Sequence, residues 1–210
     1  MEHKIRLLSK KRLNHDVSLF KFEKPLNFKF VPGHSIMASI NKPSLIKAQI
    51  PLSFISENEN PFIEFIIKNY PGKLTEQFHN LKIQDEIIMH SPFGSIRYTK
   101  PGVFIAGGIG IAPFMAIFRQ LKKEEKLKGN KLIYSNKEKR DILFEEELKR
   151  LLGKENCIFT LTRENKSNYY DGRVNEEFLK KTIKNINQDF YVLGSEEFVK
   201  DVKESINKLK

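Results

Sequence analysis

The stretch that decides the fold runs from Gly102 to Leu121 and reads GVFIAGGIGIAPFMAIFRQL. Its first part, Val103 to Ala106, is apolar and rich in β-branched and aromatic residues, which is typical of a short buried strand. Three glycines follow within four positions, at Gly107, Gly108 and Gly110. Glycines at this density interrupt a regular element and mark a tight loop. The stretch therefore predicts a buried strand that ends in a glycine loop.

A helix is expected to begin at Pro113, directly after the loop. Proline suits the first helical position because its missing N–H would have had no partner there. The residues that follow at the spacings of a buried helical stripe are Phe114, Ile117, Phe118 and Leu121. A strand, a glycine loop and a helix N-terminus can together bind the phosphates of a dinucleotide, because free N–H groups and the helix dipole face the anion. Proline stands where the full G-x-G-x-x-G pattern has its third glycine or alanine, so the loop alone also fits a tight turn in any α/β domain.

The length and composition are those of a folded protein. The 210 residues allow one large domain or two of about 100 residues each. A hydrophobic content of 40% with 17 phenylalanines argues against disorder. No apolar run approaches the ~18 residues of a membrane span, and the first residues lack the apolar core of a signal peptide. We therefore expect a soluble, cytoplasmic protein.

Cysteine content and charge exclude some classes of function. The single cysteine, Cys157, excludes a disulfide framework and a cysteine-ligated iron–sulfur cluster within the chain. The net charge is 37 − 26 = +11, which suits nucleic acid, an anionic membrane surface, an anionic cofactor or an acidic protein partner. The lysines are mixed with acidic residues, as in Lys122–Lys126, and resemble solvated helix faces more than a nucleic-acid groove. The five histidines show no metal-ligand spacing, and nothing suggests a Ser–His–Asp triad.

The residues before the glycine loop read as short strands separated by turn residues. The six candidates are Lys4–Leu8, Val17–Phe22, Ser35–Ile40, Leu52–Ser56, Phe62–Asn69 and Glu86–His90. Short strands at this spacing predict a small antiparallel β-barrel. One interruption, Tyr70–Phe78, reads as a turn running into a short helix with Thr75 as its N-cap. That helix start either binds a second anion or simply closes the barrel.

Strands and helices alternate after the loop. The expected elements are strands at 103–106, Lys131–Tyr134, Cys157–Thr162 and Phe190–Leu193, with helices at 113–126, Phe144–Leu152, Asn175–Ile183 and Glu196–Leu209. This alternation predicts a parallel sheet with helices on both faces. Pro101 and Gly102 stand where the character changes, so we expect a β-barrel domain at 1–98 and an α/β domain at 99–210. Ligands bind beyond the carboxyl ends of such strands, where Gly107, Ser135, Thr162 and Gly194 would lie.

The order of several motifs resembles the ferredoxin–NADP reductase family, in particular the short bacterial flavodoxin or ferredoxin reductases, over nearly the whole chain. The matching stretches are Phe30–His34 (FVPGH), Pro51–Phe54 (PLSF), Gly72–Thr75 (GKLT), Ser91–Gly94 (SPFG), Gly107–Pro113 (GGIGIAP) and Tyr191–Ser195 (YVLGS). Their order and spacing are far more specific than any one of them. The resemblance implies a non-covalently bound flavin, FAD rather than FMN, held between barrel and sheet and exchanging hydride with NADPH or NADH.

The resemblance also implies which residues bind the flavin. The family motif reads Arg-x-Tyr-Ser or a Thr variant, and here Ser53 supplies the hydroxyl, whereas Ile50 stands in the arginine place and Leu52 in the aromatic place. Isoleucine lacks the charge and bidentate geometry that arginine offers a phosphate. The expected flavin contacts are Pro51, Leu52, Ser53, Phe54, Lys68, Gly72, Lys73, Leu74 and Thr75, with Ser53 as the catalytic candidate that tunes the flavin.

The nucleotide residues follow from the same comparison. The glycine loop and the end of the last strand are expected to hold the diphosphate through Gly107, Gly108, Gly110, Ile111, Pro113 and Gly194. The segment after the second strand offers a hydroxyl and cations where NAD-selective sites commonly present an acid, namely Ser135, Lys137, Lys139 and Arg140. This cluster favours NADPH, although a charged surface loop is the alternative. Leu193-Gly194-Ser195 replaces the Cys-Gly-Pro of many family members.

The sequence thus predicts an NAD(P)H-dependent flavoprotein reductase. The electron acceptor would be a separate, acidic flavodoxin or ferredoxin, or a small molecule, since the chain holds no cluster of its own. Two alternatives remain open. One is a regulatory nucleotide- or flavin-binding module that has lost catalysis, which the departures at Ile50, Leu52 and Leu193 suggest. The other is a basic nucleic-acid-binding barrel, which explains none of the glycine loops.

Overall fold

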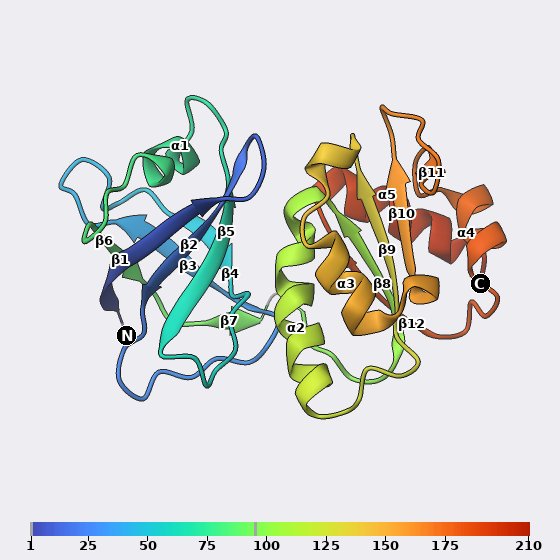
Figure 1. Ribbon diagram of the computed structural model, residues 1–210, viewed down its shortest axis with the longest axis horizontal. Helices are drawn as coiled ribbons and strands as arrows, with labels where there is room; N and C mark the ends of the chain where they lie inside the picture. The colour runs from blue at the N-terminus through green and yellow to red at the C-terminus, as the bar shows by residue number, and fades with distance from the viewer. Residues whose placement is uncertain (1, 95) are drawn as a thin grey trace. The chain divides into compact units, whose positions relative to one another are not determined.

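The computed structural model describes residues 2–94 and 96–210 (Figure 1). The chain divides into two compact units. The first comprises Met1–Arg97 together with Ala112–Gln120, and the second comprises Tyr98–Ile111 together with Leu121–Lys210. No helix within these described residues is long and apolar enough to cross a membrane.

The first unit is a nearly closed antiparallel β-barrel. Its elements are β1 (His3–Arg12), β2 (Val17–Glu23), β3 (His34–Ile40), β4 (Ile50–Ser53), β5 (Phe62–Lys68), α1 (Leu74–His79), β6 (Glu86–Met89) and β7 (Phe93–Gly94). The strand order is β4-β3-β6-β1-β2-β5, with β7 added on β3. The two end strands, β4 and β5, approach each other just after β4, where the Ile55 N–H donates to the Glu64 carbonyl at 3.0 Å. The six-stranded barrel with one short helix is confirmed, and β7 is an additional two-residue strand.

The barrel core is built mainly from phenylalanine and isoleucine. Alternate residues of each strand point inward, so that Ile36, Ala38 and Ile40 of β3 are all buried. Phe54 stacks on Phe30 with 4.0 Å between ring centroids. A part of α2 (Ile111–Lys123) belongs to this unit, and Arg119 donates from Nη1 to the Ile55 carbonyl at 2.6 Å.

Strand β4 begins at Ile50 and ends at Ser53, two to three residues before the predicted limits of Leu52 and Ser56. The shift places Pro51 inside the strand. Proline is tolerated there because β4 is the end strand of the order, where a missing N–H need not break a ladder bond.

The second unit is a five-stranded parallel sheet. Its strands are β8 (Gly102–Gly107), β9 (Lys131–Asn136), β10 (Cys157–Leu161), β11 (Tyr170–Asp171) and β12 (Asp189–Leu193), in the order β11-β10-β9-β8-β12. Its longer helices are α3 (Glu145–Leu152), α4 (Glu176–Thr182) and α5 (Glu196–Asn207), and its single-turn helices are η1 (Gly108–Gly110), η2 (Lys139–Asp141) and η3 (Lys154–Asn156). The predicted parallel α/β unit is confirmed, and the two-residue β11 is an addition.

Helices cover both faces of this sheet. Val103 and Ile105 of β8 pack with Phe178 of α4 and Val202 of α5 on one face. On the other face, α3 places the Lys149 ammonium 5.5 Å from the ring centroid of Phe159. The alternation of side chains along each strand therefore gives each face its own apolar layer.

Helix boundaries follow local chemistry. Helix α4 begins at Glu176, one residue after its predicted start, because the Asn175 side chain accepts the Phe178 N–H at 2.9 Å and so caps the helix. Helix α2 begins at Ile111 instead of Pro113, because η1 runs directly into it, and Pro113 lies in its first turn. It ends at Lys123, before Glu125, whose φ of 57° is left-handed.

Candidate functional site

The three glycines of the loop after β8 have different surroundings. Gly108 has a φ of +53°, and no atom lies within 4 Å of where its Cβ would stand. A Cβ on Gly110, by contrast, would lie 2.6 Å from the Leu193 carbonyl oxygen. Gly110 is therefore required by packing, whereas the open side of Gly108 can admit a ligand close to the backbone.

Gly107 and Gly194 are both packed against Phe198. A Cβ on Gly107 would lie 2.9 Å from the Phe198 ring, and one on Gly194 would lie 2.6 Å from it. Phe198 stands in the first turn of α5, and its N–H is accepted by the Ser195 hydroxyl at 3.3 Å. Phe198 is thus the side chain that makes glycine necessary at the ends of β8 and β12. Sequence reasoning missed it, although its place three residues after the Ser195 cap is a usable signal.

The structure fits a dinucleotide at this edge of the sheet. The open space at Gly108 lies just before the N-terminus of α2, whose dipole favours an anion. Two further polar atoms near the same strand ends, Asn136 Nδ2 and Thr160 Oγ1, are buried without a hydrogen-bond partner in the part of the chain described. Ser135 is buried as well and pairs in register with Gly107. Ile111 is also buried, so its backbone alone can reach a ligand.

One of the predicted cations after β9, Arg140, is already paired with a carboxylate. Arg140 Nε lies 2.8 Å from Glu138 Oε2. The backbone N–H of Lys139 donates to Glu164 Oε2 at 2.7 Å, and its ammonium lies 5.6 Å from the ring centroid of Tyr169. The cluster that the sequence suggested is therefore interleaved with carboxylates. The guanidinium of Arg140 is therefore less available to a phosphate than the sequence suggested.

Lys137 and Arg163 are two exposed cations at this edge. The Arg163 N–H donates to the Lys137 carbonyl at 2.9 Å, which joins the segments after β9 and β10. Both residues are exposed, and neither makes an ion pair within residues 2–94 and 96–210. Sequence reasoning missed Arg163, which directly follows Thr162 at the predicted end of a strand.

The segment 162–169, here called the Arg163 loop, is fastened at its far end. The Tyr169 hydroxyl donates to Glu145, 2.8 Å from Oε1 and 3.0 Å from Oε2, and Lys149 Nζ lies 2.6 Å from the same Oε1. Partial burial and the bond to Glu145 raise the pKa of Tyr169 to about 12. Burial opposes ionisation of Glu145, but the bonds from Lys149 and Tyr169 outweigh it and lower its pKa. The loop is thereby held on α3.

The flavin candidates on β4 divide into accessible and buried residues. Leu52 belongs to the barrel core, and Ile50 packs against that core, so the two residues that replace arginine and the aromatic serve packing. Phe54 is fully buried, so it and Leu52 can contact a ligand only through their backbone. Pro51 is exposed and Ser53 half-exposed. The Ser53 hydroxyl lies 2.9 Å from that of the buried Ser35, its register partner on β3.

The turn before α1 differs from the sequence prediction. Thr75 is not the N-cap, because the helix begins at Leu74 and its N-cap is Lys73, which gives no side-chain cap. The Thr75 hydroxyl instead accepts the Tyr70 N–H at 3.1 Å, and Gly72, with a φ of +73°, donates its N–H to Glu76 Oε2 at 3.0 Å. The left-handed Gly72 ends the turn early and so moves the helix start forward.

Some donors at this turn stay available to a flavin. The N–H groups of Leu74 and Thr75 donate to no acceptor in the described chain, and Lys73 is exposed. Lys68 is less available, since its Nζ lies 2.8 Å from Asp16 Oδ2. The backbone donors thus fit an anionic group, with Lys73 as the accessible cation beside them.

Sequence comparison identifies both halves of the chain. A family described as "Oxidoreductase FAD-binding domain" matches residues 4–98, and one described as "Oxidoreductase NAD-binding domain" matches residues 104–204. The chain belongs to the ferredoxin reductase-like family. It is an oxidoreductase with one domain for FAD and one for a nicotinamide dinucleotide, as the resemblance implied.

Among curated relatives, NADH-cytochrome b5 reductase 2 of Mus musculus is 26% identical over 89% of this chain and 82% of its own length. The Rattus norvegicus protein of the same name is 29% identical over 68% of this chain and 64% of its own length. NADH-cytochrome b5 reductase 1 of Mortierella alpina is 32% identical over 69% of this chain and 52% of its own length. The chain spans about half to two thirds of the length of most of these relatives.

Solved structures share the fold at lower identity. A ferredoxin NADP+ reductase from Neisseria gonorrhoeae with bound FAD and NADP superimposes with a TM-score of 0.86 at 19% identity, covering 99% of this chain and 91% of that one. The cytochrome b5 reductase domain of Ulva prolifera nitrate reductase gives 0.85 at 18% identity, covering 100% and 93%. The two-domain reductase fold of this family member is thus shared along the whole chain.

Proposed function

We propose that the chain is an NAD(P)H-dependent flavoprotein reductase that passes electrons to a separate one-electron carrier. The observation that carries the proposal is the open space at Gly108 before the N-terminus of α2, in a chain whose other domain binds FAD. When bound, the flavin supplies the conversion between a hydride and single electrons. The protein's own part is to bind and orient the two cofactors.

On the nucleotide side, Gly108 lets the diphosphate approach the backbone, and the first turn of α2 stabilises its charge. Gly107, Gly110 and Gly194 keep this loop in place by allowing close packing with Phe198 and Leu193. Pro113 adds no N–H to that turn, so the remaining N–H groups there belong to the residues before it.

On the flavin side, Ser53 is the residue proposed to tune the flavin. Its hydroxyl shares a hydrogen bond with Ser35, which is 2% exposed and so holds the orientation of the Ser53 hydroxyl. The N–H groups of Leu74 and Thr75, with Lys73 beside them, are proposed to bind the FAD diphosphate in place of the missing arginine. We expect Ser53→Ala to retain FAD but to slow flavin reduction, and loss of FAD from this variant would assign Ser53 to binding only.

The preferred nucleotide is proposed to be NADPH, with Lys137 and Arg163 binding its 2′-phosphate. Both cations are exposed and unpaired, and their segments are joined by a backbone hydrogen bond. A guanidinium can hold a phosphate through two hydrogen bonds, each charge-assisted. The names of the relatives, NADH-cytochrome b5 reductases, favour NADH instead, so the preference is tested by a direct measurement.

That measurement is kcat/KM for NADPH and for NADH in paired variants. Arg163→Gln should lower kcat/KM for NADPH about tenfold or more and leave that for NADH within about twofold, since only NADPH carries the extra phosphate. Arg140→Gln is the matched control, because Arg140 is paired with Glu138. If both variants have an equal effect, or if the native enzyme prefers NADH, Lys137 and Arg163 do not select NADPH through its 2′-phosphate.

The electron acceptor is proposed to be an acidic carrier such as flavodoxin or ferredoxin. The net charge of +11 supports this choice, since opposite charges speed encounter. Rates of reduction of flavodoxin, ferredoxin and cytochrome b5 should be compared at low and high salt. A carrier that is reduced fastest at low salt is the expected result, and reduction of none of the three would leave a small-molecule acceptor as the second candidate.

A further inference from the structure

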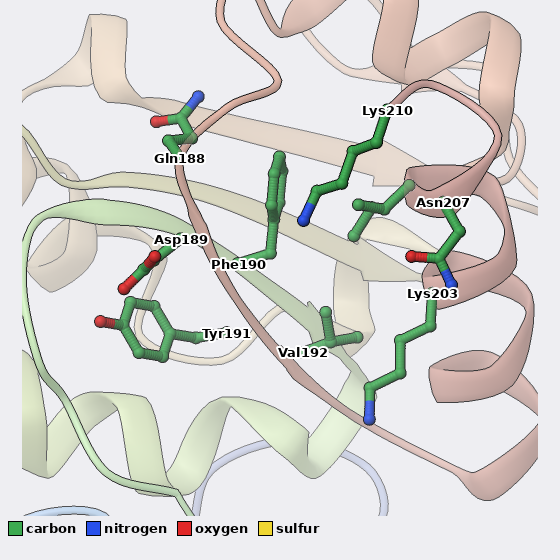
Figure 2. Close-up of a pocket in the computed structure, with 9 residues that line it drawn as sticks. Gln188, Asp189, Phe190, Tyr191, Val192, Lys203, Asn207 and Lys210 are labelled. Atoms are coloured by element: carbon green, nitrogen blue, oxygen red, sulfur yellow. The ribbon is translucent and has the colours of Figure 1, made fainter.

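Helix α2 starts at the glycine loop and continues into the first unit. It begins at Ile111, directly after the loop, and its residues Ala112–Gln120 belong to the unit that contains the FAD-binding domain. Arg119 lies eight residues after Ile111, which is about 12 Å along a helix. The cavity of about 350 Å³ in Figure 2 has no part in this connection, because its described lining residues lie on or next to β12 and α5.

Within the first unit, α2 contacts the barrel at the ends of two paired strands. Arg119 Nη1 donates to the Ile55 carbonyl at 2.6 Å, just after the end of β4. Ile117 lies against Gly33, just before the start of β3, since its Cδ1 atom would be 3.1 Å from a Cβ on that glycine. The same helix therefore contacts the chain on both sides of the β3–β4 pair.

These two contacts lie next to the hydrogen-bonded serines. β3 and β4 are antiparallel with Ser35 opposite Ser53, and the two hydroxyls lie 2.9 Å apart. The pairing continues one residue beyond the end of β4, where a backbone hydrogen bond of 3.2 Å reaches β3. One further step in this antiparallel order brings Gly33 opposite Ile55. Helix α2 thus holds each strand two residues away from its serine.

The Arg119 guanidinium supplies a donor that the Ile55 carbonyl needs. Ile55 is 1% exposed, and its N–H already donates to the Glu64 carbonyl of β5 at 3.0 Å. A buried carbonyl without a donor is unfavourable, and a charged donor makes the stronger kind of hydrogen bond. Removal of the guanidinium would therefore loosen the chain two residues after Ser53.

We propose that Arg119 is a positioning residue that acts on the flavin through Ser53. It fixes the chain after β4, and this keeps the Ser53 hydroxyl on Ser35 in the orientation that tunes the flavin. Because Arg119 stands on the helix whose first turn is proposed to bind the dinucleotide, one helix joins the glycine loop to the strand that carries Ser53. The inference rests on the proposed roles of Ser53 and of that loop.

The test measures the rate constant of flavin reduction at saturating NADPH by anaerobic stopped flow. Arg119→Gln should lower it about fivefold or more and leave the dissociation constant for NADP+ within about twofold, because Ser53 shifts while the glycine loop does not. Arg119→Lys, which retains a charged donor, should restore most of the rate. Lys122→Gln is the matched control and should change neither value, since this exposed lysine lies on the same helix and carries the same charge.

A double-mutant cycle separates an action through Ser53 from a general loss of stability. In the Ser53→Ala background, Arg119→Gln should slow reduction by less than about twofold, because the hydroxyl that it positions is already absent. An equal loss of rate in both backgrounds would overturn the proposal. If Arg119→Gln does not fold, Ile117→Val, which removes the methyl group next to Gly33, should slow reduction about two- to threefold with Ser53 present and not in its absence.

Amide hydrogen exchange tests the placement without turnover. Exchange at Phe54 and Ile55 should be at least about tenfold faster in Arg119→Gln than in the native FAD-bound chain, and unchanged in Lys122→Gln. Native-like exchange in Arg119→Gln would overturn the proposal. If NADPH does not reduce the native flavin, the proposed function fails, and the exchange rates still decide whether Arg119 holds the chain after Ser53.

Discussion

At the scale of single residues, the glycine loop after β8 contains two kinds of glycine. Gly110 has the Leu193 carbonyl 2.6 Å from its missing Cβ, whereas Gly108 has open space in the same direction. Gly110→Ala should therefore destabilise the second unit by roughly 2 kcal/mol or more, since backbone must move. Gly108→Ala should cost only about 1 kcal/mol, for its left-handed φ.

The two variants should separate folding from binding. Gly108→Ala is expected to fold and to raise KM for the dinucleotide at least about tenfold, because the new methyl group occupies the approach to the backbone. Thermal unfolding and steady-state kinetics of both variants measure this. Native-like KM in Gly108→Ala would show that the open side of Gly108 is not the diphosphate site.

Tyr169 positions the Arg163 loop through Glu145. Tyr169→Phe removes the hydroxyl that donates to the Glu145 carboxylate, 2.8 and 3.0 Å from its two oxygens, and frees one end of the loop. We expect KM for NADPH to rise about three- to tenfold with kcat unchanged, because Arg163 would no longer be held in position to bind the 2′-phosphate. KM for NADH should stay the same.

Tyr170→Phe is the matched control for Tyr169→Phe. The adjacent Tyr170 packs its ring edge-on against Phe178, and its hydroxyl takes part in no hydrogen bond among the described residues. Loss of a hydroxyl there should leave both KM values unchanged. If the two variants behave alike, or if kcat falls with KM, the positioning role of Tyr169 is wrong.

At the scale of elements, α3 is joined to the Arg163 loop by a network that depends on an ionised Glu145. Its pKa is lowered in the folded chain from the ordinary value of 4.5. The network therefore contributes fully above that value, and its contribution is lost as pH falls through the lower folded value. Glu145→Gln should flatten the decline in stability below about pH 4.5. A variant whose melting temperature declines with acid as steeply as the native protein would contradict this.

Elements with long apolar patterns were predictable from sequence, and those set by single contacts were not. The alternation after Gly102 predicted the parallel sheet and the two last helices, one of which begins at Glu196 as expected and the other one residue after Asn175. The strands β7 and β11 are two residues long, which is too short for any pattern to show. The N-cap placed at Thr75 was wrong because the left-handed Gly72 fixes the preceding turn.

The candidate site was predictable where backbone geometry demands a residue type. The glycines of the loop are such residues. The pairing of Arg140 with Glu138, the exposure of Arg163 beside Lys137, and the packing of Phe198 on Gly107 and Gly194 depend on neighbours far apart in sequence. The burial of Leu52 likewise appears only once β4 is paired with β3.

At the scale of the whole molecule, we propose that this chain carries FAD and reduces it with NADPH, although Ile50 and Leu52 replace two residues of the family's flavin motif. Lys73 and the N–H groups of Leu74 and Thr75 are the proposed substitutes for the arginine. The match of residues 4–98 to an oxidoreductase FAD-binding domain supports FAD as the cofactor.

The most direct test is an anaerobic titration of the purified protein with NADPH, monitored by the visible absorption of the flavin. We predict a yellow protein that releases FAD on denaturation, whose flavin absorbance is bleached by one equivalent of NADPH and restored by an oxidised one-electron carrier. A colourless protein that cannot be reconstituted with FAD, or a bound flavin that NADPH leaves oxidised, would contradict the account.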